Sequence, residues 1–190
     1  MTSDRRRQIL DAALEAFLER GYAATSIADI RARSGASTGS IYHFFSGKGA
    51  LAEALLREAV SGWSLHSMAA LDPKATPEQA LKSSVRGLVR WAFEHPAQFR
   101  FMDEIRSLAP ADPDFAAVRS LLEEGRTLGA AQYARMAAEG AVRTLPFSIA
   151  HALMLGPAYA YLRTVEALPA DQASRIAELF ADAAWQAVKA

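Results

Sequence analysis

Apolar side chains recur every three or four positions along most of the 190-residue chain, with polar side chains between them. This spacing is typical of helices that bury one face. In the first such segment, Ile9, Ala13 and Phe17 form one apolar row. Alanine is abundant, and strand-like runs of β-branched residues are absent. The pattern predicts an all-α protein, with helices over residues 4–20, 25–34, 38–45, 48–70, 77–94, 96–108, 114–138, 146–167 and 169–188.

The fourth predicted helix indicates how the chain divides into domains. The three helices before it are short and have one small apolar core between them. The helix over residues 48–70 is too long to pack on that core alone, so part of it belongs to the rest of the chain. We therefore predict a three-helix amino-terminal domain over residues 1–48 and a larger helical domain over residues 49–190.

The segment TSIADIRARSGASTGSIYHFFSGK reads as two short helices joined by a tight turn. Thr25 or Ser26 can cap the first helix, and Asp29 follows Ser26 by three positions, which is a common pattern at helix starts. Gly35 ends this helix, because glycine adopts a left-handed conformation at little cost. Ser37 is suited to cap the second helix. The pattern predicts a helix-turn-helix.

The second short helix has an apolar side and a polar amino end. Ile41, Phe44 and Phe45 can point into a core. The amino end of such a helix enters the major groove of DNA, so small side chains there permit close approach. Hydroxyl groups and free N–H groups near a helix start also suit phosphate oxygens. The predicted DNA-binding residues are Thr25, Ser26, Ser37, Thr38, Gly39, Ser40, Tyr42, His43 and Lys48.

The sequence GASTGSIYHFFSGKGAL resembles the recognition segment of TetR-type transcriptional regulators, and the resemblance covers roughly residues 5–56. Its glycines, capping residues and aromatic residues occur in the same order. Three positions depart from the usual form: Phe44 stands in place of His or Tyr, Gly49 in place of an acid, and Arg31 in place of a common alanine. These departures concern the operator sequence more than DNA binding itself.

This resemblance implies a role for each domain. TetR-type regulators bind DNA through the amino-terminal domain and a small effector through the larger domain, and most act as repressors. Their last two helices form a four-helix dimer interface. From the residues alone, the apolar helices over 146–167 and 169–188 either complete the monomer core or pair with another subunit. The resemblance favours a homodimer, whose symmetry predicts a palindromic operator.

Charge and cysteine content exclude several other classes. The chain has 21 Lys and Arg against 21 Asp and Glu, so it is not a polyanion binder as a whole. Residues 1–48 carry seven basic and five acidic residues, which is compatible with a DNA-facing amino end. The lack of cysteine excludes disulfides and thiolate metal sites. No signal peptide or membrane span is visible, so we expect a cytoplasmic protein without membrane contact.

Aromatic and sulfur-containing side chains are frequent after residue 60, and most of them are expected to form the core. Methionine adapts to irregular shapes, and Tyr or Trp adds one directed hydrogen bond, so a subset could line an effector pocket. We expect an apolar or aromatic small molecule as the effector. The predicted pocket residues are Trp91, Phe99, Met102, Tyr133, Met136, His151 and Tyr159.

The residues do not favour an enzyme. No Gly-rich phosphate loop, Gly-x-Ser-x-Gly motif or defensible Ser/His/Asp set is present. No His or acid stands four positions after His151, where a metal site on a helix would need one. We therefore predict no catalytic residues, no metal and no cofactor. The alternative to a ligand-responsive regulator is a helical ligand-sensing or interaction protein that does not bind DNA.

Overall fold

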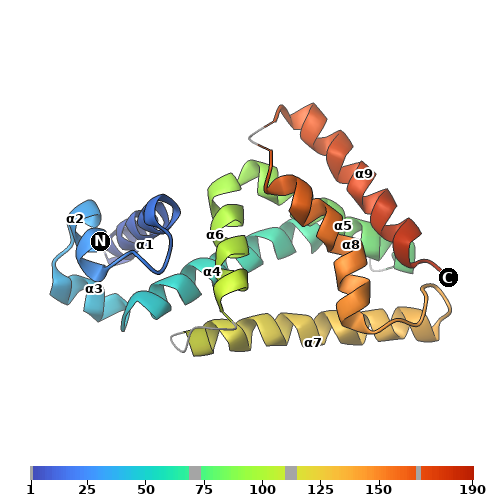
Figure 1. The fold of residues 1–190 in the computed structure, drawn as a ribbon, viewed down its shortest axis with the longest axis horizontal. Coiled ribbons are helices and arrows are strands. Elements are labelled where there is room, and N and C mark those ends of the chain that lie inside the picture. Colours follow the sequence, from blue (N-terminus) through green and yellow to red (C-terminus); the bar gives the residue numbers. More distant parts are fainter. Residues whose placement is uncertain (1, 69–73, 110–114, 166–167) are drawn as a thin grey trace. The chain divides into compact units, whose positions relative to one another are not determined.

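The computed structural model describes residues 2–68, 74–109, 115–165 and 168–190. Within these ranges the chain forms nine helices and no β-strand, which confirms the predicted all-α class (Figure 1). In chain order the helices are α1 (Thr2–Arg20), α2 (Ile27–Ser34), α3 (Thr38–Phe44), α4 (Lys48–Met68), α5 (Pro77–Glu94), α6 (Pro96–Leu108), α7 (Ala116–Ala138), α8 (Phe147–Leu162) and α9 (Ala170–Val188).

Helix α8 ends earlier than the sequence pattern predicted. Its last residue is Leu162, so the prediction was wrong for residues 163–165; residues 166–167 lie outside the described ranges. The chain leaves the helix in a turn, where the Thr164 hydroxyl and backbone N–H both donate to the Tyr161 carbonyl, at 2.8 and 2.9 Å. A threonine side chain that bonds to nearby backbone competes in this way with helix continuation.

The chain folds as two compact units. The first contains residues 1–59 and 97–123, and the second contains residues 60–96 and 124–190. Helices α1, α2 and α3 therefore belong to the first unit together with nearly all of α6. Helices α5, α8 and α9 belong to the second. The division into a domain of residues 1–48 and a domain of residues 49–190 stays a prediction.

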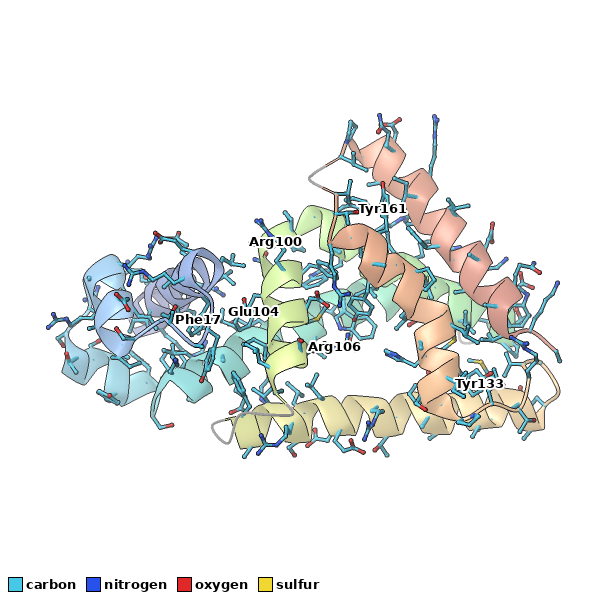
Figure 2. All side chains as sticks on the ribbon, viewed as in Figure 1. Phe17, Arg100, Glu104, Arg106, Tyr133 and Tyr161 are labelled. Atoms are coloured by element: carbon cyan, nitrogen blue, oxygen red, sulfur yellow. The ribbon has the colours of Figure 1, made fainter. Side chains whose placement is uncertain are left out.

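A buried aromatic cluster fastens α1 to α6 within the first unit. The ring centroid of Phe17 lies 5.7 Å from that of Phe101, and the centroid of Tyr22 lies 4.4 Å from that of Phe115. The backbone N–H of Tyr22 also donates to the Glu104 carboxylate at 2.9 Å. Figure 2 labels Phe17 on α1 and Glu104 on α6. Burying each ring contributes roughly 1.5–3 kcal/mol, so α6 helps to fix the orientation of α1.

Helix α5 packs against α9 within the second unit. Arg86 on α5 donates to both carboxylate oxygens of Glu178 on α9, at 2.6 and 2.8 Å, and this bond lowers the pKa of Glu178. Partly exposed ion pairs contribute only about 0–1 kcal/mol, so apolar packing supplies most of the stability. The buried face of α9 consists mainly of small side chains, which allow close approach of α5: Ala173, Ala177, Ala181, Ala184 and Val188.

Helix α8 lies beside α9 (Figure 1). Much of the apolar surface of α8 is exposed. Its sequence FSIAHALMLGPAYAYL contains no Asp, Glu, Lys or Arg. Ala150, Ala158 and Leu162 are buried, whereas Ile149 is 49% exposed and Leu153 is 40% exposed. Whether α8 and α9 complete the monomer core or pair with a second subunit stays a prediction. An uncharged apolar face remains at the surface.

Candidate DNA-binding interface

Helix α2 begins with the capping arrangement that the sequence predicted. Ser26 is the N-cap: its hydroxyl oxygen accepts from the Asp29 N–H at 3.2 Å, and its own N–H donates to the Asp29 carboxylate at 2.8 Å. These bonds satisfy two N–H groups that a helix start leaves without partners. Bonds from the Ser26 side chain and then its backbone lower the pKa of Asp29. Ile30 is fully buried and anchors α2 to the core.

The turn between α2 and α3 is held by a glycine and by an arginine from α1. Gly35 has a φ of 61°, and its N–H donates to the Arg31 carbonyl at 3.1 Å, which ends α2 as predicted. The Arg5 guanidinium donates to the Gly35 carbonyl at 2.8 Å. Sequence reasoning missed this bond, because 30 residues separate its partners. The turn is therefore fixed by α1 as well as by its own conformation.

Helix α3 has the predicted two-sided character. Ile41 is fully buried and Phe45, the C-cap, is 5% exposed, so these side chains attach the helix to the core. Phe44, which was also predicted to point inward, is only partly buried, unlike Ile41 and Phe45. The Ser37 hydroxyl oxygen caps α3 by accepting from the Ser40 N–H at 3.1 Å. Helix α3 is therefore attached to the core through Ile41 and Phe45 and is capped at its amino end by Ser37.

The outer surface of α3 is polar and open. Tyr42 is 53% exposed, although most large aromatic side chains of this unit are buried. A Cβ added at Gly39 would meet no atom within 4 Å, so the surface above the first turn is unobstructed. The predicted DNA-binding residues that this surface brings together are Ser37, Thr38, Gly39, Ser40, Tyr42 and His43, all of them exposed except Ser40, which is half-buried. Ser26 is also exposed, at the start of α2.

Two other predicted DNA-binding residues have partners inside the protein. Thr25 is 2% exposed, and its hydroxyl lies 3.1 Å from the Ala16 carbonyl and 2.8 Å from the Gly21 carbonyl. The Lys48 ammonium donates to the Tyr22 carbonyl at 2.8 Å and lies 4.3 Å from the centroid of the Tyr22 ring. Both side chains hold the loop after α1 in place. Their contact with DNA stays a prediction.

Acidic residues are unevenly distributed over the helix-turn-helix. Residues 30–52 contain no Asp or Glu. The nearby acids lie on α1, where Glu15 and Glu19 pair with Arg33, or at the start of α2, where Asp29 pairs with Arg20 at 2.8 Å. From Ile30 to the end of α3, the chain therefore carries no negative side chain that would repel a phosphate group.

The arginines at the start of α1 are also held by the protein. Arg7 donates to Asp11 at 2.6 Å and to Glu58 of α4 at 2.6 Å. Both bonds raise the pKa of Arg7, and the bond to Asp11 has the larger effect. The Arg6 guanidinium lies 5.3 Å from the centroid of the Phe45 ring and 3.7 Å from Glu58. Only the four-residue spacing of Arg7 and Asp11 was visible in the sequence. These contacts fasten α1 to α4.

The predicted effector residues do not form one group in either unit. Phe99 and Met102 are buried in the first unit. The other five belong to the second unit, where Trp91, Tyr133 and Met136 are buried and His151 and Tyr159 are half-buried. The pocket as a whole stays a prediction.

A hollow of about 350 Å³ lies at the carboxyl end of α7. One predicted pocket residue, Tyr133, lines it, and Figure 2 labels this residue. The Tyr133 hydroxyl donates to the Arg143 carbonyl at 2.8 Å, and burial raises its pKa. The hollow is otherwise lined by Ala130, Ala134, Ala137, Ala138, Thr144, Leu145 and Phe147.

The described part of the chain contains no group of His, Cys, Asp and Glu that could hold a metal ion. A search of the same residues also finds no helix with the length and apolarity needed to cross a membrane.

The helix-turn-helix matches a known family. Residues 9–55 match the family described as bacterial regulatory proteins, tetR family. The HTH-type transcriptional regulator BetI of Escherichia coli (strain K12 / DH10B) is 43% identical over 90 residues, which is 46% of each protein. The chain thus spans less than half the length of the curated relatives that it matches.

Solved structures extend the likeness over the whole fold. A TetR family regulator from Marinobacter aquaeolei VT8 is 21% identical with a TM-score of 0.77, covering 98% of this chain and 96% of that one. A putative tetR family regulator from Shewanella sp. PV-4 is 21% identical with a TM-score of 0.75, covering 98% of both chains. Residues 9–55 thus resemble the amino-terminal segment of the tetR family, and the fold of the whole chain is that of the solved tetR structures.

Proposed function

We propose that this protein is a DNA-binding transcriptional regulator that inserts the amino end of α3 into the major groove. The observation that carries the proposal is the surface of α3: small and hydroxyl-bearing residues and Tyr42 are exposed, while Ile41 and Phe45 are buried beneath them. A solvent-exposed aromatic side chain beside open hydroxyl groups suits contacts with base edges and phosphates. The absence of acids from residues 30–52 favours the approach of a polyanion.

We further propose that the protein acts as a homodimer through α8 and α9. The uncharged face of α8, with Ile149 and Leu153 exposed, would gain from burial against a second copy. Leu179 on α9, the second helix of the pair, is also 65% exposed. A two-fold dimer presents two reading helices in opposite directions, so the operator would be palindromic.

In the proposed mechanism, the protein is a repressor that a small apolar or aromatic molecule releases from DNA. A ligand that binds more tightly when the two reading helices are wrongly spaced must weaken operator binding by the same factor. The buried contact between Trp91 and α4 offers one route for such coupling: a Cβ at Gly62 would lie only 2.6 Å from the Trp91 indole nitrogen. A ligand that displaced this indole would therefore also shift α4 at Gly62. A cytoplasmic location and the absence of enzymatic activity are part of the same proposal.

Fluorescence anisotropy tests the proposal on DNA from upstream of the protein's own gene, with scrambled duplex as the control. We expect tight binding that weakens steeply between low and moderate salt and that is selective for the genuine sequence. The stoichiometry should be two chains per site. If a folded dimer bound no duplex even at low salt, the protein would instead be a helical ligand-sensing or interaction protein.

A further inference from the structure

Residues 1–48 contain seven Lys and Arg residues, and six of them have partners within the protein. Arg33 and Arg20 pair with carboxylates of α1 and α2, and Lys48 with backbone carbonyls. Arg5 donates to a backbone carbonyl, and Arg6 and Arg7 pair with the carboxylate of Glu58. The Arg31 side chain is exposed and has no hydrogen bond or ion pair to any of the residues that the structure describes.

The side chain of Arg31 projects away from α1. A helix turns by about 200° over two residues, so Arg31 and Arg33 leave α2 on nearly opposite sides. Arg33 marks the side that faces α1, since it contacts Glu15 at 3.2 Å and also pairs with Glu19. Arg31 therefore lies on the side of α2 that the α1 carboxylates do not reach.

The position of Arg31 along α2 brings it close to the turn into α3. Its carbonyl accepts the N–H of Gly35, so it lies one helical turn before the residue that ends α2. The first acid after it in the sequence is Glu53, and Asp29, the last acid before it, is occupied by Ser26 and Arg20. Its positive charge is consequently not offset by any adjacent carboxylate.

We propose that Arg31 binds a phosphate of the DNA strand that borders the groove entered by α3. This assignment rests on the proposed function. Guanidinium groups suit phosphate because their planar set of N–H donors matches its oxygens. A contact from α2, which flanks the reading helix, positions the protein on DNA without reading the sequence. TetR-type segments commonly carry alanine at this position, so the contact would be an addition in this chain.

The test compares Arg31→Ala with Arg33→Ala, which removes the same charge from the opposite side of the same helix. Each protein is titrated into operator and scrambled duplex at several salt concentrations, and thermal melting checks that each is folded. For Arg31→Ala we expect a loss of about eightfold per protomer near 0.1 M salt, on both duplexes, and a salt slope reduced by about one per protomer. Arg33→Ala should change affinity much less.

Three results would overturn the assignment while leaving the proposed function standing: unchanged binding by Arg31→Ala, equal losses for the two variants, or a loss confined to the operator with an unchanged salt slope. The last result would mark a base contact instead. Failure of the unsubstituted protein to bind any duplex would overturn the proposed function itself, and this assignment with it.

Discussion

Helices α3 and α8 both leave unusual surface exposed, but the chemistry of the two surfaces is opposite. On α3, the buried residues Ile41 and Phe45 support a surface of hydroxyl groups, a glycine, a histidine and a tyrosine. On α8, Ala150, Ala158 and Leu162 are buried, whereas Ile149 and Leu153 are exposed. The α3 surface is solvated without a partner, whereas contact of the α8 surface with water is unfavourable.

The two surfaces suit different kinds of partner. An uncharged apolar helix gains stability when another apolar surface covers it, as in an obligate dimer. A polar helix end with no acid nearby suits a partner that supplies charge and hydrogen-bond acceptors, such as DNA. The surface proposed to hold two copies together is therefore on α8, and the surface proposed to bind the operator is on α3.

The largest expected effect comes from placing a charge on α8. Leu153→Glu should convert the dimer into monomers, because two-fold symmetry buries the new carboxylate twice without a partner, at a cost of about 3 kcal/mol or more. Sedimentation equilibrium measures the change. Leu65→Glu, at a 68% exposed position on α4, is the control and should leave the dimer intact. A Leu153→Glu protein that remained dimeric would remove α8 from the interface.

A smaller effect is expected from the glycine that positions the start of α8. A Cβ at Gly129 would lie 2.7 Å from the Phe147 ring, so Gly129→Ala must displace either α7 or the first residue of α8. We expect a loss of about 1–3 kcal/mol in the free energy of unfolding, measured by urea denaturation.

Gly125 on the same helix provides a matched control. A Cβ there would meet nothing within 4 Å, so Gly125→Ala should be neutral or stabilise by up to about 1 kcal/mol. Equal effects of the two substitutions would show that contact with Phe147 is not what requires a glycine.

The smallest expected effect concerns the pH dependence of the cap that positions α2. The folded-state pKa of Asp29 is below its ordinary value of 3.8, so its stabilising contribution is present above that pH and is lost as pH falls through the folded pKa. Asp29→Asn should therefore be less stable than the unsubstituted protein at pH 6, and the difference should shrink at pH 2–3. Urea denaturation at both pH values measures this. A constant difference would contradict the role of the carboxylate charge.

Local features of the fold could be predicted from the sequence because their causes lie within a few residues. Ser26 and Asp29 form their cap across three positions, and Gly35 supplies the positive φ that its turn requires. The surface of α3 follows from the same local pattern, since Ile41 and Phe45 lie four residues apart on one side of the helix.

The remainder depends on contacts between distant residues. Tyr22 bonds to Glu104 across 82 positions, and no local pattern predicts that pair. Thr25 and Lys48 are suited to DNA by residue type, but their partners in the structure are carbonyl groups brought close by the end of α1. Pocket residues are the hardest to predict, because core and pocket use the same aromatic side chains. Of the residues predicted for the pocket, only Tyr133 lines the hollow on α7.

The central claim, that the exposed face of α3 reads DNA, is tested most directly by Tyr42→Ala. The variant is titrated into operator and scrambled duplex by fluorescence anisotropy, beside Leu128→Ala, which truncates a 73% exposed side chain on α7. We predict that Tyr42→Ala retains the melting temperature and the dimer but weakens operator binding by about 1–3 kcal/mol. Leu128→Ala should bind as tightly as the unsubstituted protein. Undiminished operator binding by Tyr42→Ala would contradict the claim that this face of α3 lies against the DNA.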